Sequence, residues 1–167
     1  LYISTHQWGI FPGTGHEREV GYGKGEGKLV NLPFRGGTGD HTYGLAWQEI
    51  IEPVLKQFKP RMILVSLGAD AHLMDPLTGL TLSSSGHHDL VEGLMRSANA
   101  LVDGRISFTL EGGYHLGALA ETMADAVNIA AGHPVDVKLN YTETREMGSD
   151  GRRIKDFMDI QASYWEL

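Results

Sequence analysis

The segment 63–72 places a carboxylate and an imidazole directly after an apolar run. Residues 63–67 are mostly aliphatic, which predicts a strand buried on both faces of a parallel sheet. Asp70 and His72 follow this run. Ligands and catalytic groups gather beyond the carboxyl ends of such strands in open α/β sheets. Asp70 is therefore a candidate metal ligand, the alternative being a structural cap at the strand end. His72 is the weaker candidate.

A second apolar run, 105–110, ends in two glycines and a phenol. Glu111-Gly112-Gly113-Tyr114 follows it. Neighbouring parallel strands end at one edge of a sheet, so we expect Asp70 and Tyr114 to lie at the same rim. Glycines let the backbone approach a ligand closely. A phenolic hydroxyl can donate a hydrogen bond to a carbonyl oxygen that becomes an oxyanion. The alternative is a packed tyrosine with a satisfied hydroxyl.

Strand-like and helix-like segments alternate along the middle of the chain, which predicts a parallel sheet covered by helices. We expect Asp40 to cap the first helix and Pro53 to kink or divide it. His87-His88 is interpreted as a solvated first turn, and 136–151 as a polar loop. Phe157, Ile160, Tyr164 and Trp165 are expected to dock the last helix. The predicted strands are 1–4, 28–32, 62–67 and 105–110, and the predicted helices are 40–58, 84 or 85–102, 116–131 and 152–165.

The composition is that of a single globular domain. The chain has 167 residues, of which 41% are hydrophobic, and a net charge of -7 that argues against direct binding to nucleic acid or anionic membranes. It contains no cysteine, so a metal would need His, Asp or Glu ligands. No apolar stretch has the length of a membrane span, and no signal peptide opens the chain. We expect a cytoplasmic protein.

The glycine-rich segment 21–28 invites a phosphate-loop interpretation that fails in detail. Glu26 stands where a dinucleotide-binding motif needs its last glycine, and Leu29 follows Lys28 where a P-loop needs Ser or Thr. A strand is predicted next, so no helix N-terminus would hold a phosphate. An irregular tight loop is the favoured interpretation, and a nucleotide-binding α/β domain remains only as a minor alternative.

Several segments, taken in order, resemble the histone deacetylase superfamily, including its bacterial acetoin-utilisation and acetylpolyamine-amidohydrolase relatives. The forms at 75–77 and 110–112 are closer to the class II-like and bacterial branch than to class I. The matching segments are Tyr2-Ile3-Ser4-Thr5-His6-Gln7, Phe11-Pro12-Gly13-Thr14-Gly15, Glu19-Val20-Gly21, Val30-Asn31-Leu32-Pro33, Gly39-Asp40 with Tyr43, Leu67-Gly68-Ala69-Asp70-Ala71-His72, Asp75-Pro76-Leu77, Leu110-Glu111-Gly112-Gly113-Tyr114 and Tyr164-Trp165.

The resemblance implies a three-layer α/β/α fold with a mainly parallel sheet of the arginase and deacetylase type, and a zinc-dependent hydrolysis of N-acetyl-lysine or acetylated amines. In that reaction a zinc-bound water attacks the carbonyl and a histidine takes its proton. The implied roles are zinc binding for Asp70, stabilisation of the oxyanion for Tyr114, contact with the acetyl-lysine chain for Phe11, Gly112 and Gly113, and help in binding a monovalent cation such as potassium for Ser4 and Thr5.

The departures from the family pattern matter as much as the matches. The family's other zinc ligands and its histidine pair precede the strand with which this chain opens, and none of the eight histidines has that context. A lone aspartate does not hold a catalytic zinc. We therefore expect residues 1–167 to form the C-terminal part of one catalytic domain, with half of the sheet and the N-terminal part absent, no tight zinc and no activity alone.

The chain opens at Leu1 within a predicted strand, which suggests that upstream sequence has been lost, the alternative being a trimmed tag or leader. A non-catalytic interaction module is the alternative function. The strand 105–110 would then be a free sheet edge, a template for pairing with a separate N-terminal half or with a second copy. On that ground we expect a homo-oligomer.

Overall fold

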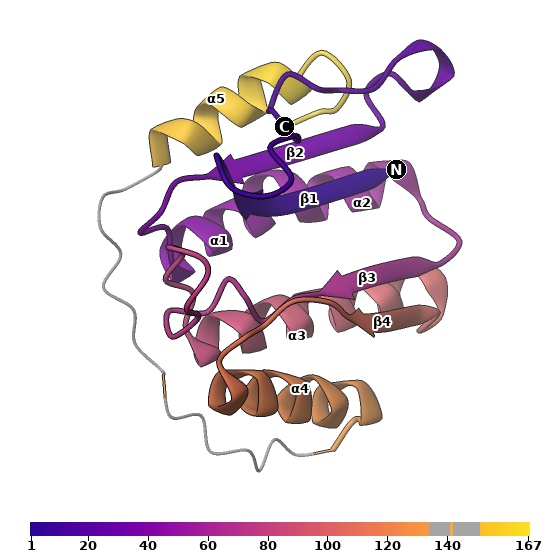
Figure 1. The fold of residues 1–167 in the computed structure, drawn as a ribbon. Helices are drawn as coiled ribbons and strands as arrows, with labels where there is room; N and C mark the ends of the chain where they lie inside the picture. Colours follow the sequence, from indigo (N-terminus) through magenta and orange to yellow (C-terminus); the bar gives the residue numbers. More distant parts are fainter. Residues whose placement is uncertain (134–140, 142–150) are drawn as a thin grey trace.

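The computed structural model describes residues 1–133, 141 and 151–167 (Figure 1). The loop predicted at 136–151 lies almost entirely outside these residues. The elements are β1 (Tyr2–Gln7), the 3-10 turn η1 (Gly23–Gly25), β2 (Leu29–Phe34), α1 (Asp40–Ala46), the π-helical η2 (Trp47–Ile51), α2 (Glu52–Phe58), β3 (Ile63–Leu67), α3 (Ser84–Val102), β4 (Ile106–Leu110), α4 (Leu116–Ala131) and α5 (Gly151–Gln161).

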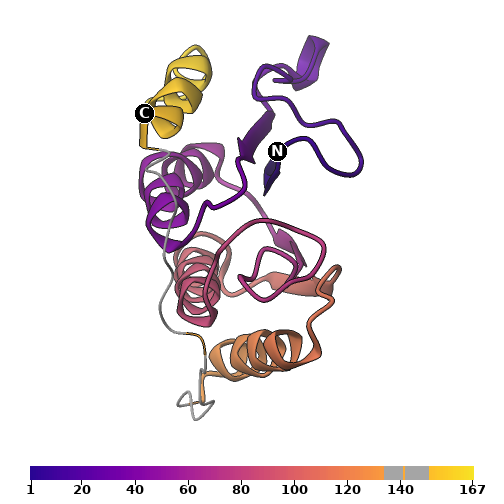
Figure 2. The same ribbon diagram turned by 60° about the vertical axis from the view of Figure 1, so that its left-hand side comes forward.

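All four described strands pair in parallel, as two separate ladders. Strand β1 pairs with β2, with Tyr2 opposite Leu29, and β3 pairs with β4, with Ile63 opposite Ile106. Within the described ranges, no ladder joins β1 to β3. The helices from α1 to α3 lie on one side of the strands, and α4 lies below β4 (Figure 2). Parallel strands alternating with helices confirm the predicted α/β class.

Strand β3 is covered on one face only. Ile63 is buried against Ala98 and Val102 of α3, whereas Leu64, on the other face, is 76% exposed. The expectation that 62–67 is buried on both faces is therefore wrong for the described part of the chain. The physical reason is that α3 covers one face of the strand, and no described helix covers Leu64.

The helix predicted from 40 to 58 is divided, as expected, next to Pro53. The proline lies in the first turn of α2, and the π-helical segment η2 comes directly before it. Proline has no N–H group, and its ring crowds the carbonyl of the residue four positions earlier, here Glu49. Widening the helix over η2 accommodates that carbonyl. Lys59 then ends α2 in the left-handed conformation.

Asp40 does not cap its own helix. Gly39 is the N-cap of α1, and the Asp40 carboxylate accepts hydrogen bonds from the backbone N–H (2.7 Å) and the hydroxyl (2.6 Å) of Ser83. Ser83 in turn caps α3, where its Oγ accepts from the N–H of Gly86. The predicted cap at Ser84 or Ser85 is thus one or two residues late. Asp40 links two helices because it orients the cap of the second.

Strand β2 runs through Pro33 rather than ending before it. Tyr2 N–H donates to the carbonyl of Lys28, and Trp8 N–H donates to the carbonyl of Phe34. In this register the even-numbered residues of β2 bond to β1, so the Pro33 nitrogen faces the edge of β2 that lies away from β1. A missing N–H at that edge costs no ladder hydrogen bond.

The main core joins β2, α1, α2 and α5. Val30, Leu32 and Phe34 of β2 are fully buried in it. Helix α5 contributes Phe157, which is 2% exposed and lies with its ring centroid 6.2 Å from that of Phe34. No helix of the described residues is long and apolar enough to cross a membrane.

The C-terminal segment docks through part of the predicted set. Trp165 is buried, and its indole N–H donates to the carbonyl of Gly27 at 3.0 Å. Tyr164 is 38% exposed, because α5 ends at Gln161 and the chain beyond it turns. Phe157 and Trp165 therefore fix α5, and Tyr164 contributes less burial than predicted.

Replacing Phe157 by alanine tests this docking. We expect Phe157→Ala to lower the free energy of unfolding by about 3–5 kcal/mol, because a large buried ring is lost from the main core. The control Asp156→Ala changes an exposed residue of the same helix and should stay within about 0.5 kcal/mol of the parent. Urea denaturation followed by circular dichroism measures both. Equal effects of the two substitutions would contradict the docking of α5.

Candidate functional site

A cleft of about 540 Å³ lies between β1 and β3 and collects most of the residues that the sequence analysis selected. Five of the seven predicted site residues line it, and Gly113 and Tyr114 do not. Those five are Ser4, Thr5, Phe11, Asp70 and Gly112.

The two loops that follow β3 and β4 run side by side. Glu111 N–H donates to the carbonyl of Leu67 at 3.1 Å, and Ala69 N–H donates to the carbonyl of Gly112 at 2.9 Å. These bonds extend the β3–β4 ladder past the carboxyl ends of both strands. The loops that carry Asp70 and Tyr114 therefore adjoin at one rim, as the sequence predicted.

The Asp70 carboxylate packs directly against the backbone of Gly112. A Cβ atom at Gly112 would lie 2.8 Å from Asp70 Cγ, so a side chain there would displace the Asp70 carboxylate from its present position. Gly113 has a φ of +130°, and a Cβ there would lie 2.9 Å from the Cβ of Ala69. Glycine at 112 therefore leaves room for the Asp70 carboxylate, and glycine at 113 is favoured both by close packing and by its backbone angle.

Asp70 is a half-buried carboxylate. Burial raises the pKa of its carboxyl group, and the nearby charge of Asp75 acts in the same direction. Among the residues that the structure describes, Asp70 forms no ion pair. A desolvated carboxylate without a cationic partner is stabilised by a bound cation, so this observation fits one metal ligand.

Tyr114 is held by its backbone and leaves its side chain accessible. Its N–H donates to Asp75 Oδ2 at 2.8 Å, and the residue is 57% exposed. The alternative of a packed tyrosine therefore does not apply. The side chain of Tyr114 is therefore accessible to solvent, although it does not line the cleft that Asp70 lines.

Ser4 and Thr5 have partners within β1 and α1. The Ser4 hydroxyl lies 2.9 Å from His6 Nδ1. The Thr5 hydroxyl hydrogen-bonds to Tyr43, whose phenol has its pKa raised by burial and lowered in part by this bond. A role of Ser4 and Thr5 in binding a monovalent cation stays a prediction.

Phe11 lies at the mouth of the cleft with 95% of its surface exposed. The loop that carries it is also anchored near β1, because His6 Nε2 lies 3.0 Å from the carbonyl of Gly15. An aromatic ring at the mouth of a cleft is placed to contact a chain that enters it. Its part in substrate binding stays a prediction.

His72 is held by protein partners. It lies in the loop beyond β3, which ends at Leu67. Met74 N–H donates to His72 Nδ1 at 3.1 Å, and His72 Nε2 lies 3.2 Å from the Ser84 hydroxyl. Both ring nitrogens have protein partners, and the residue is fully buried. His72 is a structural residue between the loop and α3.

The interpretation of His87-His88 as a solvated turn is wrong. His87 is buried, and its Nδ1–H donates to the Ser83 carbonyl at 3.1 Å. His88 lies 3.0 Å from Asp125 of α4. The spacing gave a signal for His87, since it precedes the buried Val91 by four residues on one helix face. Pairing with Asp125 depends on how α4 packs on α3 and has no local signal.

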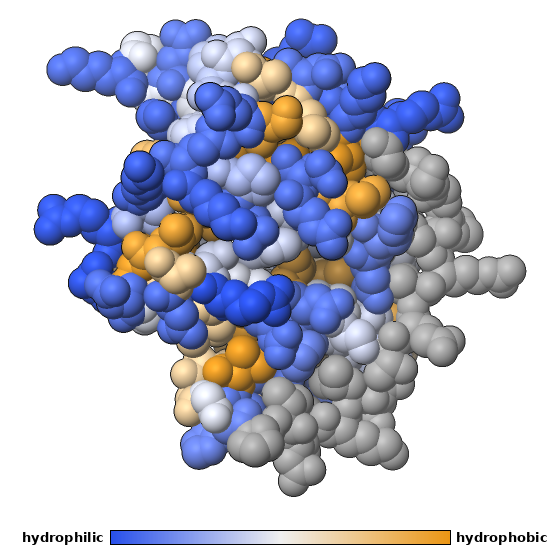
Figure 3. Space-filling view, turned by 180° about the vertical axis from the view of Figure 1, so that it is seen from behind, coloured by the Kyte–Doolittle hydropathy of each residue, from blue (hydrophilic) through white to orange (hydrophobic). Residues whose placement is uncertain are grey.

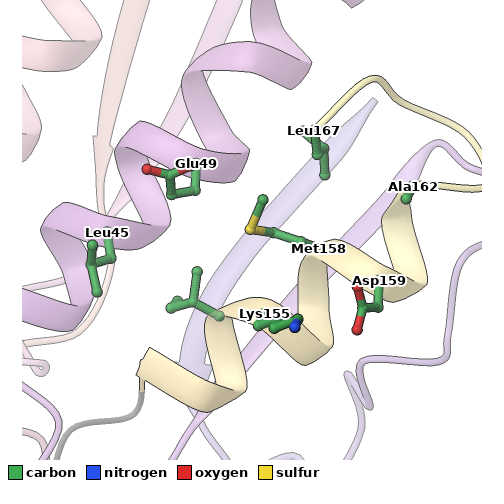
Figure 4. Close-up of a pocket in the computed structure, with 8 residues that line it drawn as sticks. Leu45, Glu49, Lys155, Met158, Asp159, Ala162 and Leu167 are labelled. Carbon is green, nitrogen blue, oxygen red and sulfur yellow. The ribbon is translucent and has the colours of Figure 1, made fainter.

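A second cavity, of about 440 Å³, lies between α5 and the helix formed by α1 and η2. Figure 4 shows Leu45 and Glu49 on one wall and Met158 and Leu167 across from them. None of the predicted site residues lines this cavity.

The helical face of the molecule shows apolar side chains in patches that are separated by hydrophilic ones (Figure 3).

The metal-binding capacity of the described residues is incomplete. No group of three or more His, Cys, Asp or Glu side chains able to hold a metal ion occurs among them. A catalytic zinc site needs about three protein ligands. The donor set in the described ranges therefore fits one ligand of such a site and not the whole of it.

Parallel strands that alternate with helices define an α/β protein, and its candidate site lies at the carboxyl ends of β3 and β4. The chain belongs to the histone deacetylase family, because the histone deacetylase domain model matches residues 1–130.

Two curated relatives and one solved structure illustrate the likeness. Histone deacetylase 10, chloroplastic, of Oryza sativa subsp. japonica is 44% identical over 134 residues, which is 80% of this chain and 30% of that protein. A probable deacetylase of Archaeoglobus fulgidus is 45% identical over 133 residues, 79% of this chain and 37% of that protein. The crystal structure of the HDA15 HD domain superposes with a TM-score of 0.83 at 30% identity, covering 99% of this chain and 44% of that one.

The likeness to the solved domain confirms the predicted deacetylase-type fold and the family resemblance. The chain spans about a third of the length of these two curated relatives.

The buried His87 makes stability depend on pH. Burial lowers the pKa of His87 to about 4, below the 6.5 of an unfolded histidine. Between these values the unfolded chain binds a proton that the folded chain does not, so stability falls as pH decreases from about 6.5 to about 4.

The slope from this residue should reach ~1.4 kcal/mol per pH unit. His87→Leu should remove the part of the slope that comes from His87 and leave the part that comes from the buried His72, whose pKa is also lowered by burial. Urea denaturation at a series of pH values measures both proteins. Identical slopes would show that His87 is not held neutral.

Proposed function

We propose that this chain supplies part of a zinc-dependent deacetylase site that acts on acetylated lysine or acetylated amines. Asp70 serves as one zinc ligand, and the Tyr114 hydroxyl donates a hydrogen bond to the substrate carbonyl. Phe11, Gly112 and Gly113 border the path of the acyl-lysine chain.

The observation that carries this proposal is the contact between the Asp70 carboxylate and the Gly112 backbone. It brings the loop after β3 and the loop after β4 to one point, with Tyr114 two residues further on. A carboxylate that attracts a cation and a phenol that donates to a developing oxyanion are two of the groups that amide hydrolysis needs.

Further ligands must come from polypeptide outside the described residues. The described ranges hold no group of three or more metal-binding side chains, and the chain spans 30% and 37% of its relatives. We therefore propose that the chain alone neither holds zinc tightly nor hydrolyses amides, and that activity requires the rest of a deacetylase domain.

The chain's own residues have limited, definable tasks. Asp70 contributes a carboxylate at the strand ends, and Tyr114 contributes a phenol on a residue that is 57% exposed. The cleft between β1 and β3 adjoins this point and is lined by Ile10 and Phe11 at its mouth. An aliphatic chain with a terminal amide fits such an apolar approach to a polar end.

Complementation tests the proposed function. The chain is assayed alone and after co-expression with the part of the Archaeoglobus fulgidus relative that has no counterpart here, using an acetyl-lysine peptide. We expect activity and zinc only in the assembly, with Asp70→Asn lowering zinc content and Tyr114→Phe lowering kcat by ~100–1000-fold.

Tyr22→Phe is the matched control, because Tyr22 is 92% exposed and does not line the cleft. It should leave kcat unchanged. Chelator-sensitive turnover by the chain alone would refute the requirement for further polypeptide. An assembly that folds and binds zinc but does not hydrolyse the peptide would refute the deacetylase function.

A second candidate function is supported by the free edge of β4. Strand β4 pairs only with β3 among the described strands. Arg105 O accepts from β3 and Glu111 N–H donates to it, so by alternation Phe108 and Leu110 direct their N–H groups away from β3. Unpaired groups in a row are a template for another strand.

We propose that a second copy of the chain occupies this edge. Arg105 and Glu111 each lie three residues from Phe108. In an antiparallel pairing centred on Phe108, Arg105 of each copy lies opposite Glu111 of the other. These exposed charges would set the register more than the affinity. Leu116 and Val127 of α4 are also exposed apolar residues, at 79% and 67%.

Replacing Leu110 by proline tests the edge pairing. Leu110→Pro removes an outward N–H, so we expect a dimer of the parent chain to shift to monomer in light scattering at equal concentration. Leu64→Ser is the control, because Leu64 is an exposed apolar residue on β3 whose substitution removes no N–H group. A parent chain that is monomeric at high concentration would refute the dimer.

A further inference from the structure

The turn at residues 75–78 connects both loops of the candidate site. Asp75 Oδ1 accepts hydrogen bonds from the N–H groups of Leu77 (2.8 Å) and Thr78 (3.3 Å), which closes a local turn. Asp75 Oδ2 accepts from the N–H of Tyr114 at 2.8 Å. The carboxylate is 8% exposed, so one buried side chain satisfies three backbone donors in two loops.

The same turn also holds the main chain of Asp70. The Thr78 hydroxyl donates a short hydrogen bond to the backbone carbonyl of Asp70. Asp75 reaches Tyr114 and Thr78 reaches Asp70, so a single turn holds the backbone of both candidate functional residues.

Tyr114 depends on this connection more than its neighbours do. The last bond between the two loops before it is that of Ala69 with Gly112. Gly113 packs against Ala69 and Leu119, and α4 begins only at Leu116. The bond to Asp75 therefore anchors the Tyr114 backbone between the Ala69–Gly112 hydrogen bond and the start of the helix.

We propose that Asp75 is a positioning residue, whose carboxylate sets the place of Tyr114 relative to Asp70. The inference rests on the function proposed for Tyr114 and Asp70. Displacing a catalytic group by about 1 Å can cost ~100-fold in rate. A carboxylate that fixes the loop carrying Tyr114 can therefore matter for the rate, although burying it costs solvation free energy. Asp75 itself touches neither substrate nor reacting atoms.

The substitution Asp75→Asn separates this role from general stability. The asparagine amide has one acceptor oxygen and one donor nitrogen, so it cannot accept both from the N–H groups of Leu77 and Thr78 and from the N–H of Tyr114. Asp40→Asn is the matched control, because Asp40 accepts two hydrogen bonds from Ser83 that connect α1 to α3 at another place.

The first readout is amide hydrogen exchange at Tyr114, measured by NMR on the chain. In the parent chain this amide should exchange slowly although the residue is largely exposed, because it is hydrogen-bonded to Asp75. This first measurement needs no variant. Asp75→Asn should speed its exchange by ~10–100-fold, as expected for loss of a hydrogen bond to a charged group. Asp40→Asn should leave it unchanged. An unprotected Tyr114 amide in the parent, or equal effects of the two variants, would overturn the inference.

The second readout is kinetic and uses the assembled deacetylase. Asp75→Asn should lower kcat by ~10–100-fold with KM nearly unchanged, because the phenol acts in the transition state. Asp40→Asn should change neither kcat nor KM, once kcat is calculated per folded protein. If the parent assembly does not deacetylate, the proposed function fails. If it deacetylates and Asp75→Asn retains kcat, the positioning role fails.

Discussion

The close packing of the Asp70 carboxylate against the Gly112 backbone is the constraint on which this site depends. It combines a residue without a side chain at 112, hydrogen bonds that continue past both strand ends, and a positive φ at Gly113. The parallel pairing of β3 and β4 places the two loops side by side, and the glycines allow them to approach closely. The sheet thus creates the site by bringing together two loops that are about forty residues apart in sequence.

The sequence was sufficient for the features that depend on local pattern. The α4 helix has its predicted bounds, because alanine-rich periodicity ends at Gly132 in the left-handed conformation. The shared rim of Asp70 and Tyr114 followed from two apolar runs ending in glycine-containing turns, since parallel strands place their carboxyl ends together. The division of the helix near Pro53 followed from the chemistry of proline alone.

The features that were missed depend on contacts between distant elements. Asp40 orients Ser83, and His88 meets Asp125, because helices pack together in ways that no local spacing encodes. The single-sided cover of β3 has the same origin, since an apolar run shows only that a strand can be buried on both faces and does not supply the layer that covers it. The role of Asp75 was hidden for the same reason, because an Asp-Pro pair reads as a turn whatever its carboxylate contacts.

Asp75 acts on the candidate site in two ways, through its charge and through its hydrogen bonds. Burial and Asp75 together disfavour the charged form of Asp70, while the bonds of Asp75 fix the loop that carries Tyr114. One carboxylate therefore destabilises the charge of its neighbour in the same arrangement that orders the site. Backbone hydrogen bonds to the Asp70 carboxylate act in the opposite direction and favour its charged form. A cation bound at Asp70 would favour the charged form further, which is the physical link between this carboxylate and the metal-ligand role proposed for it.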